Sequence, residues 1–400
     1  PMRATTSTIS LTERQVTTWL TLILGLAFAL RIGAGIALPD QSGMLGDIAA
    51  YREAGRMLWS TGQIGSPFHM PLYPALIAAW GPGWTQLLLD IVISTVTVWL
   101  IFELANATFG DPRVALLAAA GTAIYPYLIF YSVVGLTETL FIALVIAAYV
   151  CWYRGMNAAA AVCASLAILT RPIFDPIAPI LVAYFALFIQ RQTVTGAIRN
   201  VLLYIVIYCV ILGPWWLHNY KAYGTFVRLN LGGGLALLSG NNPTNQTGGI
   251  DTQLKISIDK FDGIANPVER DKAMRAYAWD YIKSDPKHFL QQAVLKFGRF
   301  WQPWPHSEGY QSPLFVLLSL LSFPPVLLMA SVFVVWRGYT HWRHITPIVL
   351  FVGYLTAIHM VFPGSLRYRL PLEPLLIVLA AAGTVELVAR FRRRTPIAVE

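Results

Sequence analysis

The sequence predicts an all-α, polytopic integral membrane protein. Apolar residue types make up 56% of its 400 residues, whereas charged types make up only 12%. A soluble globular domain contains roughly 25% charged residues, and a soluble chain has no means of burying so much apolar surface. The composition therefore excludes an ordinary cytosolic enzyme, a disordered protein and a fibrous protein. The three cysteines lie in apolar runs, which excludes a disulfide framework and a thiolate zinc site.

Long apolar runs locate the membrane spans. A span needs roughly 20 apolar residues to cross about 30 Å of hydrocarbon, and such runs predict roughly ten transmembrane helices, within a range of about nine to thirteen. The first run is too long for a signal peptide and lacks a small-residue cleavage site, so we interpret it as an uncleaved anchor. The expected spans are 17–38, 84–106, 113–133, 136–153, 157–170, 172–190, 198–217, 313–336, 345–362 and 371–389.

Arginine residues indicate the orientation of these spans. With a cytoplasmic N-terminus, every turn on the inner side is basic and almost none is acidic, as the positive-inside rule requires. The net charge of +9 is therefore mostly an orientation signal, and no nucleic-acid partner is implied. The expected organisation is a cytoplasmic N-terminus (1–16), a transmembrane module (17–217) with a first outer loop (39–83), a large outer loop (218–312), C-terminal spans (313–389) and a basic cytoplasmic tail (390–400).

The first outer loop contains a predicted amphipathic helix. Asp47 precedes the apolar-periodic segment 48–61, and Gly62 follows it. An acidic N-cap before the segment and a glycine after it are typical helix boundaries. We therefore expect a helix over 48–61 that Asp47 caps.

The large outer loop contains two further predicted helices. Asn266 followed by Pro267 and Glu269 combines a cap, a first-turn proline and a glutamate three residues on. Asp285, followed by Pro286, starts the other helix. Amphipathic helices beside long spans are expected to lie along the membrane surface. In the last helix, Lys296 and Arg299 are expected outside an apolar stripe of Phe289, Ala293, Phe297 and Phe300.

Ionisable side chains gather in the outer loops and at the outer ends of the spans. Charges near hydrocarbon are costly, and those that are retained usually line a cavity or a pathway. One carboxylate suits a general base, and several cations suit a phosphate. The combination favours transfer chemistry on a lipid-linked phosphosugar. The residues are Asp40, Asp47, His69, Glu138, Arg171, Asp175, Lys296, Arg299, Arg367 and Arg369.

Short motifs also occur in a fixed order along the chain. They are Asp47–Tyr51, His69–Pro74, Leu136–Phe141, Leu169–Pro172, Pro214–Tyr220 and Arg367–Pro374. Each alone is weak, but the ordered set, spread over about 17–390, resembles the C-type glycosyltransferase (GT-C) superfamily, most specifically its protein mannosyltransferase and aminoarabinose transferase branch. The chain departs from that pattern at Ile48, where a second acid is usual, and at His218, where arginine is common.

The resemblance implies a GT-C fold and an inverting glycosyltransferase. The donor would be a polyprenyl-phosphate sugar, the acceptor a glycan, lipid or protein, and the site would face the periplasm from a bacterial inner membrane. Asp47 would be the general base, with Glu138 as a second catalytic residue. No cofactor is required, although some relatives use a divalent metal, for which His69 is the candidate ligand. Donor-phosphate ligands would be Arg171, Lys296, Arg299, Arg367 and Arg369, and the substrate cavity would contain Tyr51, His69, Tyr73, His218 and Tyr368.

Simpler interpretations stay open for these residues. Asp47 has the alternative role of a helix cap only, and Arg367 and Arg369 that of interfacial anchors. For the whole protein, the alternatives are a lipid-linked glycan polymerase or ligase, and a non-enzymatic lipid or polysaccharide transporter. A transporter needs a polar path through the spans, and mid-membrane charges such as Asp90 are few.

Overall fold

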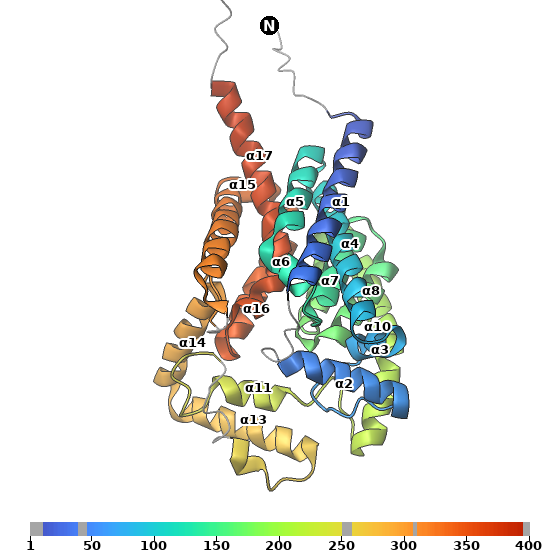
Figure 1. Cartoon of the computed structure of the whole chain (residues 1–400), viewed down its shortest axis with the longest axis vertical. Coiled ribbons are helices and arrows are strands. Elements are labelled where there is room, and N and C mark those ends of the chain that lie inside the picture. The colour runs from blue at the N-terminus through green and yellow to red at the C-terminus, as the bar shows by residue number, and fades with distance from the viewer. Residues whose placement is uncertain (1–10, 39–45, 250–257, 307–309, 395–400) are drawn as a thin grey trace, which may run out of the picture.

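The computed structural model describes residues 11–38, 46–249, 258–306 and 310–394, and the side chains of these residues up to 391. Within those ranges every regular element is a helix, and the helices form an elongated bundle (Figure 1). Its main members are α1 (Glu13–Ala37), α4 (Trp84–Phe109), α5 (Pro112–Ile124), α6 (Pro126–Tyr131), α7 (Glu138–Tyr153), α8 (Asn157–Thr170), α9 (Ala178–Tyr184), α10 (Val194–Tyr223), α15 (Pro313–Val361) and α17 (Glu373–Arg394).

A second group of shorter helices covers one end of the bundle. This end, drawn at the bottom of Figure 1, is called the Asp47 end below, and the opposite end, where α17 finishes, is called the Arg390 end. The covering helices are α2 (Gly46–Thr61), α3 (Leu72–Trp80), α11 (Gly233–Gly240), α13 (Pro267–Ser284), α14 (Pro286–Trp301) and α16 (Leu366–Arg369).

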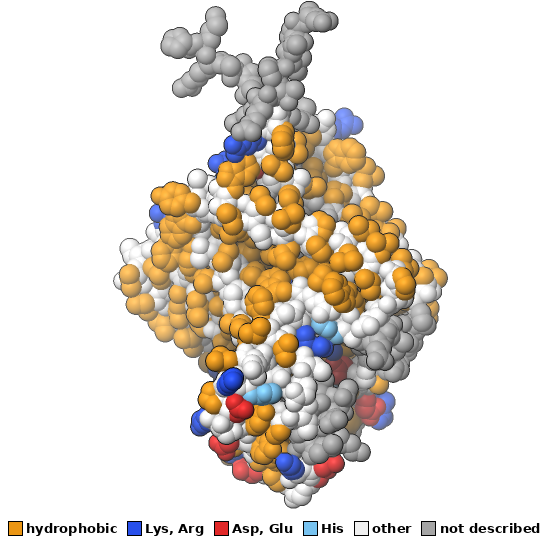
Figure 2. Space-filling view, turned by 90° about the vertical axis from the view of Figure 1, so that its left-hand side faces the viewer, with side chains coloured by type: hydrophobic (Ala, Val, Ile, Leu, Met, Phe, Trp, Pro, Cys, Tyr) orange, Lys and Arg blue, Asp and Glu red, His pale blue; other side chains and the backbone are white. Residues whose placement is uncertain are grey.

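The bundle has the surface of an integral membrane protein. Five helical segments within the described residues are long and apolar enough to cross a membrane, and shorter apolar helices pack among them. Large apolar side chains such as Leu22, Val206, Val210 and Leu321 are exposed on the bundle. Figure 2 shows an apolar belt around the middle of one face, with charged side chains concentrated below it. So large an exposed apolar surface requires a nonaqueous surrounding, which confirms the membrane class predicted from composition.

Helix α15 doubles back within its length. The ring of Phe300 stacks on His359 at 5.3 Å, and the adjacent Trp301 stacks on Phe323 at 6.2 Å. A straight α-helix would hold residues 323 and 359 about 54 Å apart, so the two halves of α15 run antiparallel. The predicted spans 313–336 and 345–362 correspond to these two halves.

Proline divides two other predicted spans. Over 113–133, α5 ends before Pro126, and α6 begins there. The predicted span 172–190 becomes a 3₁₀ turn, the short helix α9 and a π-helical turn at Phe185–Ile189. Proline lacks the amide hydrogen that a continuous helix requires and disfavours helical geometry in the preceding residue.

The capping predictions are confirmed for two of the three outer helices. The side chain of Asn266 accepts hydrogen bonds from the amides of Val268 and Glu269, and that of Asp285 accepts one from the amide of His288. The prediction for the helix near Asp47 is wrong in one respect. Because α2 begins at Gly46, Asp47 lies inside its first turn rather than at its N-cap.

The predicted apolar stripe of α14 is only partly correct. Ala293 and Phe300 are buried, but Phe297 is exposed. Lys296 is fully buried on the same face as Ala293 and Phe300, contrary to the prediction that it lies outside the apolar stripe. Helical periodicity therefore located the stripe within about one position, but it did not reveal that a lysine is buried there.

Helices α11 and α13 pack closely at the Asp47 end around Leu238, Met274 and Ala278. Gly234 makes this contact possible. Its amide donates to the carboxylate of Asp271 at 2.7 Å, and a Cβ atom at position 234 would lie 2.1 Å from the carbonyl oxygen of Asp271.

We expect Gly234→Ala to lower the thermal unfolding midpoint of the detergent-solubilised protein. The added methyl group forces α11 away from α13, and overpacking of this kind destabilises a protein by about 3 kcal/mol. Gly263→Ala is the control, because a Cβ atom there meets no neighbouring atom within 4 Å. Equal midpoints for the two variants would contradict the close approach.

Candidate functional site

Two carboxylates and two guanidinium groups alternate at the Asp47 end. Nη1 of Arg367 donates to Oδ2 of Asp47 at 2.6 Å, and Nε of Arg367 donates to Oε1 of Glu138. Nη1 of Arg171 donates to the same Glu138 oxygen at 2.5 Å. The four residues come from α2, α7, the C-cap of α8 and α16, so distant parts of the chain meet here. We call them the Asp47 cluster.

The two carboxylates of the cluster differ sharply in exposure. The side chain of Glu138 is fully buried, whereas that of Asp47 is 55% exposed. A buried carboxylate is stable only with close countercharges, which Arg171 and Arg367 provide. Glu138 therefore holds the two arginines in place, and Asp47 is the carboxylate that an external molecule can reach.

Aromatic side chains support α2 beside the cluster. The ring of Tyr51 lies 4.5 Å from that of His69 and meets the ring of Tyr73 edge-on at 5.7 Å. Tyr73 is buried, donates to Oδ2 of Asp90 at 2.7 Å and accepts from Gln86 at 3.0 Å. Tyr73 and Asp90 are thus internal supports, and Tyr51 and His69 are the more accessible members of this group.

Tyr368 continues the site from Arg171. The Arg171 guanidinium lies 5.9 Å from the ring centre of Tyr368, which stacks on His359 at 4.8 Å. Sequence reasoning missed His359, and it also missed Phe141, whose ring lies 5.9 Å from Arg171. A histidine inside an apolar run is a signal that would have identified His359. Phe141 closes the motif Leu136–Phe141, and that motif is the signal that could have identified it.

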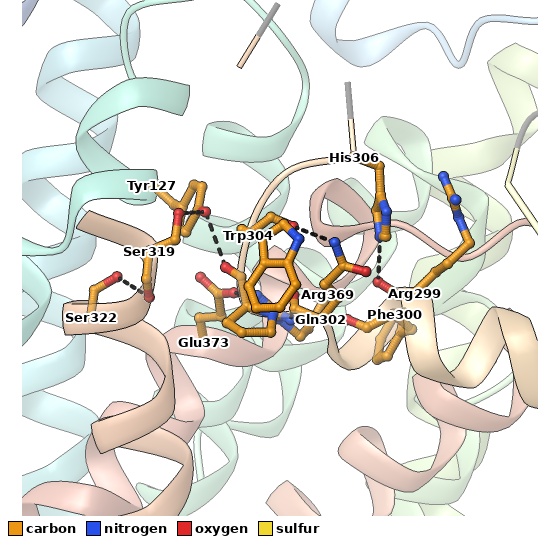
Figure 3. Close-up of polar contacts among 11 residues, drawn as sticks. Tyr127, Arg299, Phe300, Gln302, Trp304, His306, Ser319, Ser322, Arg369 and Glu373 are labelled. Atoms are coloured by element: carbon orange, nitrogen blue, oxygen red, sulfur yellow. Dashed lines mark hydrogen bonds and ion pairs between the residues drawn. The ribbon is translucent and has the colours of Figure 1, made fainter. Parts of the chain in front are cut away.

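Arg369 is placed differently from Arg367. It is fully buried, pairs with Glu373 at 2.9 Å, and donates to the carbonyl oxygens of Phe300 at 3.0 Å and Gln302 at 2.8 Å (Figure 3). Its guanidinium also lies 3.5 Å from the ring centre of Phe323. These contacts join α14, α15 and α17, so Arg369 is engaged internally and is not open to a donor phosphate, contrary to the sequence prediction.

Lys296 is also engaged internally. Its ammonium group donates to Oδ1 of Asn241 and to the carbonyl oxygen of Val361, both at 2.8 Å. Burial lowers the pKa of Lys296 to about 8. A Cβ atom at Gly364 would lie 2.4 Å from the carbonyl oxygen of Lys296. The lysine thus fastens α14 to the segment between α15 and α16, and it is not brought to the Asp47 cluster.

The remaining predicted site residues do not contact the Asp47 cluster. Arg299 is half-buried against Gly249, and its carbonyl oxygen bonds to His306 at 3.0 Å (Figure 3). The ring of His218 stacks on Trp215 at 5.0 Å. Asp175 pairs with Arg228. Asp40 lies outside the described residues.

The described part of the chain shows no divalent-metal site at this cluster. Among the described residues, no group of three or more His, Cys, Asp or Glu side chains gathers to hold a metal ion. Arg367 contacts both Asp47 and Glu138, so it occupies the position of a cation shared by the two carboxylates. His69 stands next to Tyr51, and burial lowers its pKa while Asp47 acts in the opposite direction, which leaves the imidazole largely neutral at pH 7.

Comparison with known proteins identifies the fold. No protein-family model matches the sequence, and no curated protein matches it significantly. The oligosaccharyltransferase AglB from Archaeoglobus fulgidus, in complex with an inhibitory peptide and a dolichol-phosphate, is 12% identical and aligns with a TM-score of 0.58 over 96% of this chain and 52% of that one. A structure of the Archaeoglobus fulgidus oligosaccharyltransferase in complex with Zn and sulfate is also 12% identical, with a TM-score of 0.53 over 94% and 50%.

A third solved structure is less similar in shape. ArnT from Cupriavidus metallidurans, bound to undecaprenyl phosphate, is 15% identical over 96% of this chain and 82% of that one, and its TM-score of 0.42 is too low to establish a shared fold. This chain spans about half the length of the oligosaccharyltransferase that it matches. The two oligosaccharyltransferase structures show that the protein shares their fold, so the predicted GT-C fold is confirmed at the level of the fold alone.

We expect Arg369→Met to lower the stability of the folded protein. The substitution leaves Glu373 buried without its countercharge, and loss of one partner of a buried ion pair destabilises a protein by about 3–5 kcal/mol. The thermal unfolding midpoint should fall, and it should recover in the double variant Arg369→Met/Glu373→Leu. A stable single variant with weakened donor binding would instead place Arg369 in the substrate site.

Proposed function

We propose that this protein is a membrane glycosyltransferase that moves a sugar from a polyprenyl-phosphate donor to an acceptor hydroxyl or amide at the Asp47 end. The observation that carries the proposal is the Asp47 cluster, in which an accessible carboxylate lies beside two arginines at one end of a membrane bundle. The GT-C fold supports it, because the solved neighbours with this fold are oligosaccharyltransferases.

Asp47 is the general base in this proposal. Its carboxylate takes the proton from the acceptor while the acceptor atom attacks the anomeric carbon of the sugar. The bond from that carbon to the phosphate oxygen breaks, and its electron pair leaves with the phosphate. Because the acceptor attacks from the face opposite the phosphate, the configuration is inverted. A positioned general base contributes a factor of about 10²–10⁴ to the rate.

Arg367 and Arg171 stabilise the leaving phosphate. The phosphate is already anionic, so it requires positive charge more than a proton. Arg367 uses Nε for Glu138 and Nη1 for Asp47. An incoming phosphate competes with Asp47 for Nη1, while Glu138 keeps the guanidinium in place. Donor binding therefore frees the Asp47 carboxylate for the acceptor, which makes donor-first binding the productive order.

Tyr51, His69 and Tyr368 complete the substrate surface. Burial raises the pKa of the Tyr51 hydroxyl, so this group stays protonated at neutral pH and acts as a hydrogen-bond donor. The location that best fits this function is a bacterial inner membrane with the Asp47 end in the periplasm, since that side receives lipid-linked sugars and glycan, lipid or protein acceptors.

We expect Asp47→Asn to reduce sugar transfer by about 10²-fold or more, because the amide cannot accept the proton. The measurement is product formation by purified protein from a synthetic polyprenyl-phosphate sugar. Glu53→Gln is the matched control, since Glu53 lies on the same helix and pairs with Arg56, which is not a member of the Asp47 cluster. Full activity of a well-expressed Asp47→Asn variant would rule out the base assignment.

We expect Arg367→Lys to weaken binding of polyprenyl phosphate by about tenfold. A lysine ammonium cannot contact Glu138 and a phosphate in the bidentate manner of a guanidinium. Titration of the purified variant with polyprenyl phosphate measures the effect, and Arg56→Lys on α2 is the control. Unchanged affinity in the Arg367→Lys variant would contradict the phosphate role.

A further inference from the structure

A cavity lies at the Arg390 end of the bundle. This end is opposite the end covered by α2 (Figure 1). It has a volume of about 480 Å³ and lies between α4, α5, α15 and α17. This volume falls within the range of roughly 300–1,000 Å³ that is typical of small-molecule sites. The transfer reaction proposed above makes no use of this cavity.

The cavity has an excess of positive charge. Arg113 pairs with Asp111 at 2.7 Å, and Arg337 pairs with Glu386 at 2.7 Å. Arg390 is exposed, and among the described residues no carboxylate lies within ion-pair distance of it. Two arginines are therefore neutralised, and the third leaves one positive charge uncompensated.

Aromatic contacts hold the guanidinium of Arg390 at the edge of the cavity. The guanidinium of Arg390 lies 4.8 Å from the ring centre of Trp336, and Arg337 lies 5.9 Å from the same ring. The wall of the cavity thus presents a guanidinium held over an aromatic ring, which suits an anionic oxygen.

An apolar groove of about 240 Å³ adjoins the cavity. It is lined by Trp336, Leu387, Arg390 and Phe391, so it shares Trp336 and Arg390 with the cavity. Phe391 is largely exposed on the outside of the bundle. The charged cavity and the apolar groove meet at two residues. Together they match a molecule with an anionic head and a hydrocarbon chain.

We propose that this composite site binds an anionic phospholipid, with its phosphate at Arg390 and with one acyl chain in the groove. One negative charge on the phosphate balances the uncompensated positive charge. Basic residues at the ends of spans lie at the depth of lipid headgroups, where anionic lipids are attracted to them. A soluble phosphate would occupy the cavity but leave the groove empty.

The test is native mass spectrometry of the full chain in detergent, titrated with phosphatidylglycerol, with phosphatidylcholine of the same acyl chains and with inorganic phosphate. We expect phosphatidylglycerol to bind with one-to-one stoichiometry and to be preferred over phosphatidylcholine. Arg390→Gln should weaken that binding by at least about tenfold, because hydrogen bonds to charged groups are the strong ones. Arg343→Gln is the matched control, since Arg343 lies over Trp342 at 5.4 Å and lines neither the cavity nor the groove.

The outcomes separate the explanations. A selective loss in the Arg390→Gln variant, with an unchanged melting temperature and normal binding by the Arg343→Gln variant, supports the site. Equal losses in both variants would show nonspecific attraction to basic residues and would overturn it. Binding of inorganic phosphate in competition with the lipid at similar affinity, or equal affinity for both lipids, would overturn the lipid assignment.

Discussion

Burial of the Glu138 carboxylate is the constraint on which the site depends. A fully buried carboxylate in a membrane bundle requires positive partners within hydrogen-bond distance, and the chain supplies Arg171 and Arg367. Arg171 at the end of α8 and Arg367 on α16 must therefore lie beside the start of α7, where Glu138 is located. Arg367 then has one remaining face, which it turns toward the exposed Asp47 on α2. The geometry of the accessible carboxylate thus follows from the need to neutralise the buried one.

Two arginines separated by one residue serve opposite purposes in α16. Side chains two positions apart on a helix point about 200° from one another, so Arg367 and Arg369 face different surroundings. Arg367 contacts the Asp47 cluster, whereas Arg369 is buried against Phe323 and pairs with Glu373. The short helix α16 therefore joins the Asp47 cluster directly to the packing between α14, α15 and α17.

The sequence was sufficient for the fold class and for part of the site. Apolar runs, proline and capping residues act locally, so the helices near Asn266 and Asp285 were predictable. The ordered motifs also placed Asp47, Glu138, Arg171 and Arg367 in one site. Lys296 and Arg369 were not predictable, because whether a cation is buried depends on partners such as Asn241, which lies 55 positions away in the chain. Similarly, the sequence pattern did not predict that α2 begins at Gly46, which places Asp47 inside its first turn.

The reversal of α15 has a consequence for the order in which the protein is made. Residues 47, 138 and 171 emerge from the ribosome long before residue 367, and they are separated from it by both halves of α15. Until that hairpin enters the bilayer and returns the chain to the Asp47 end, Glu138 has only one of its two countercharges. Assembly of the site is therefore a late event of biosynthesis, and chains that stop before α16 carry an exposed aspartate without its arginine.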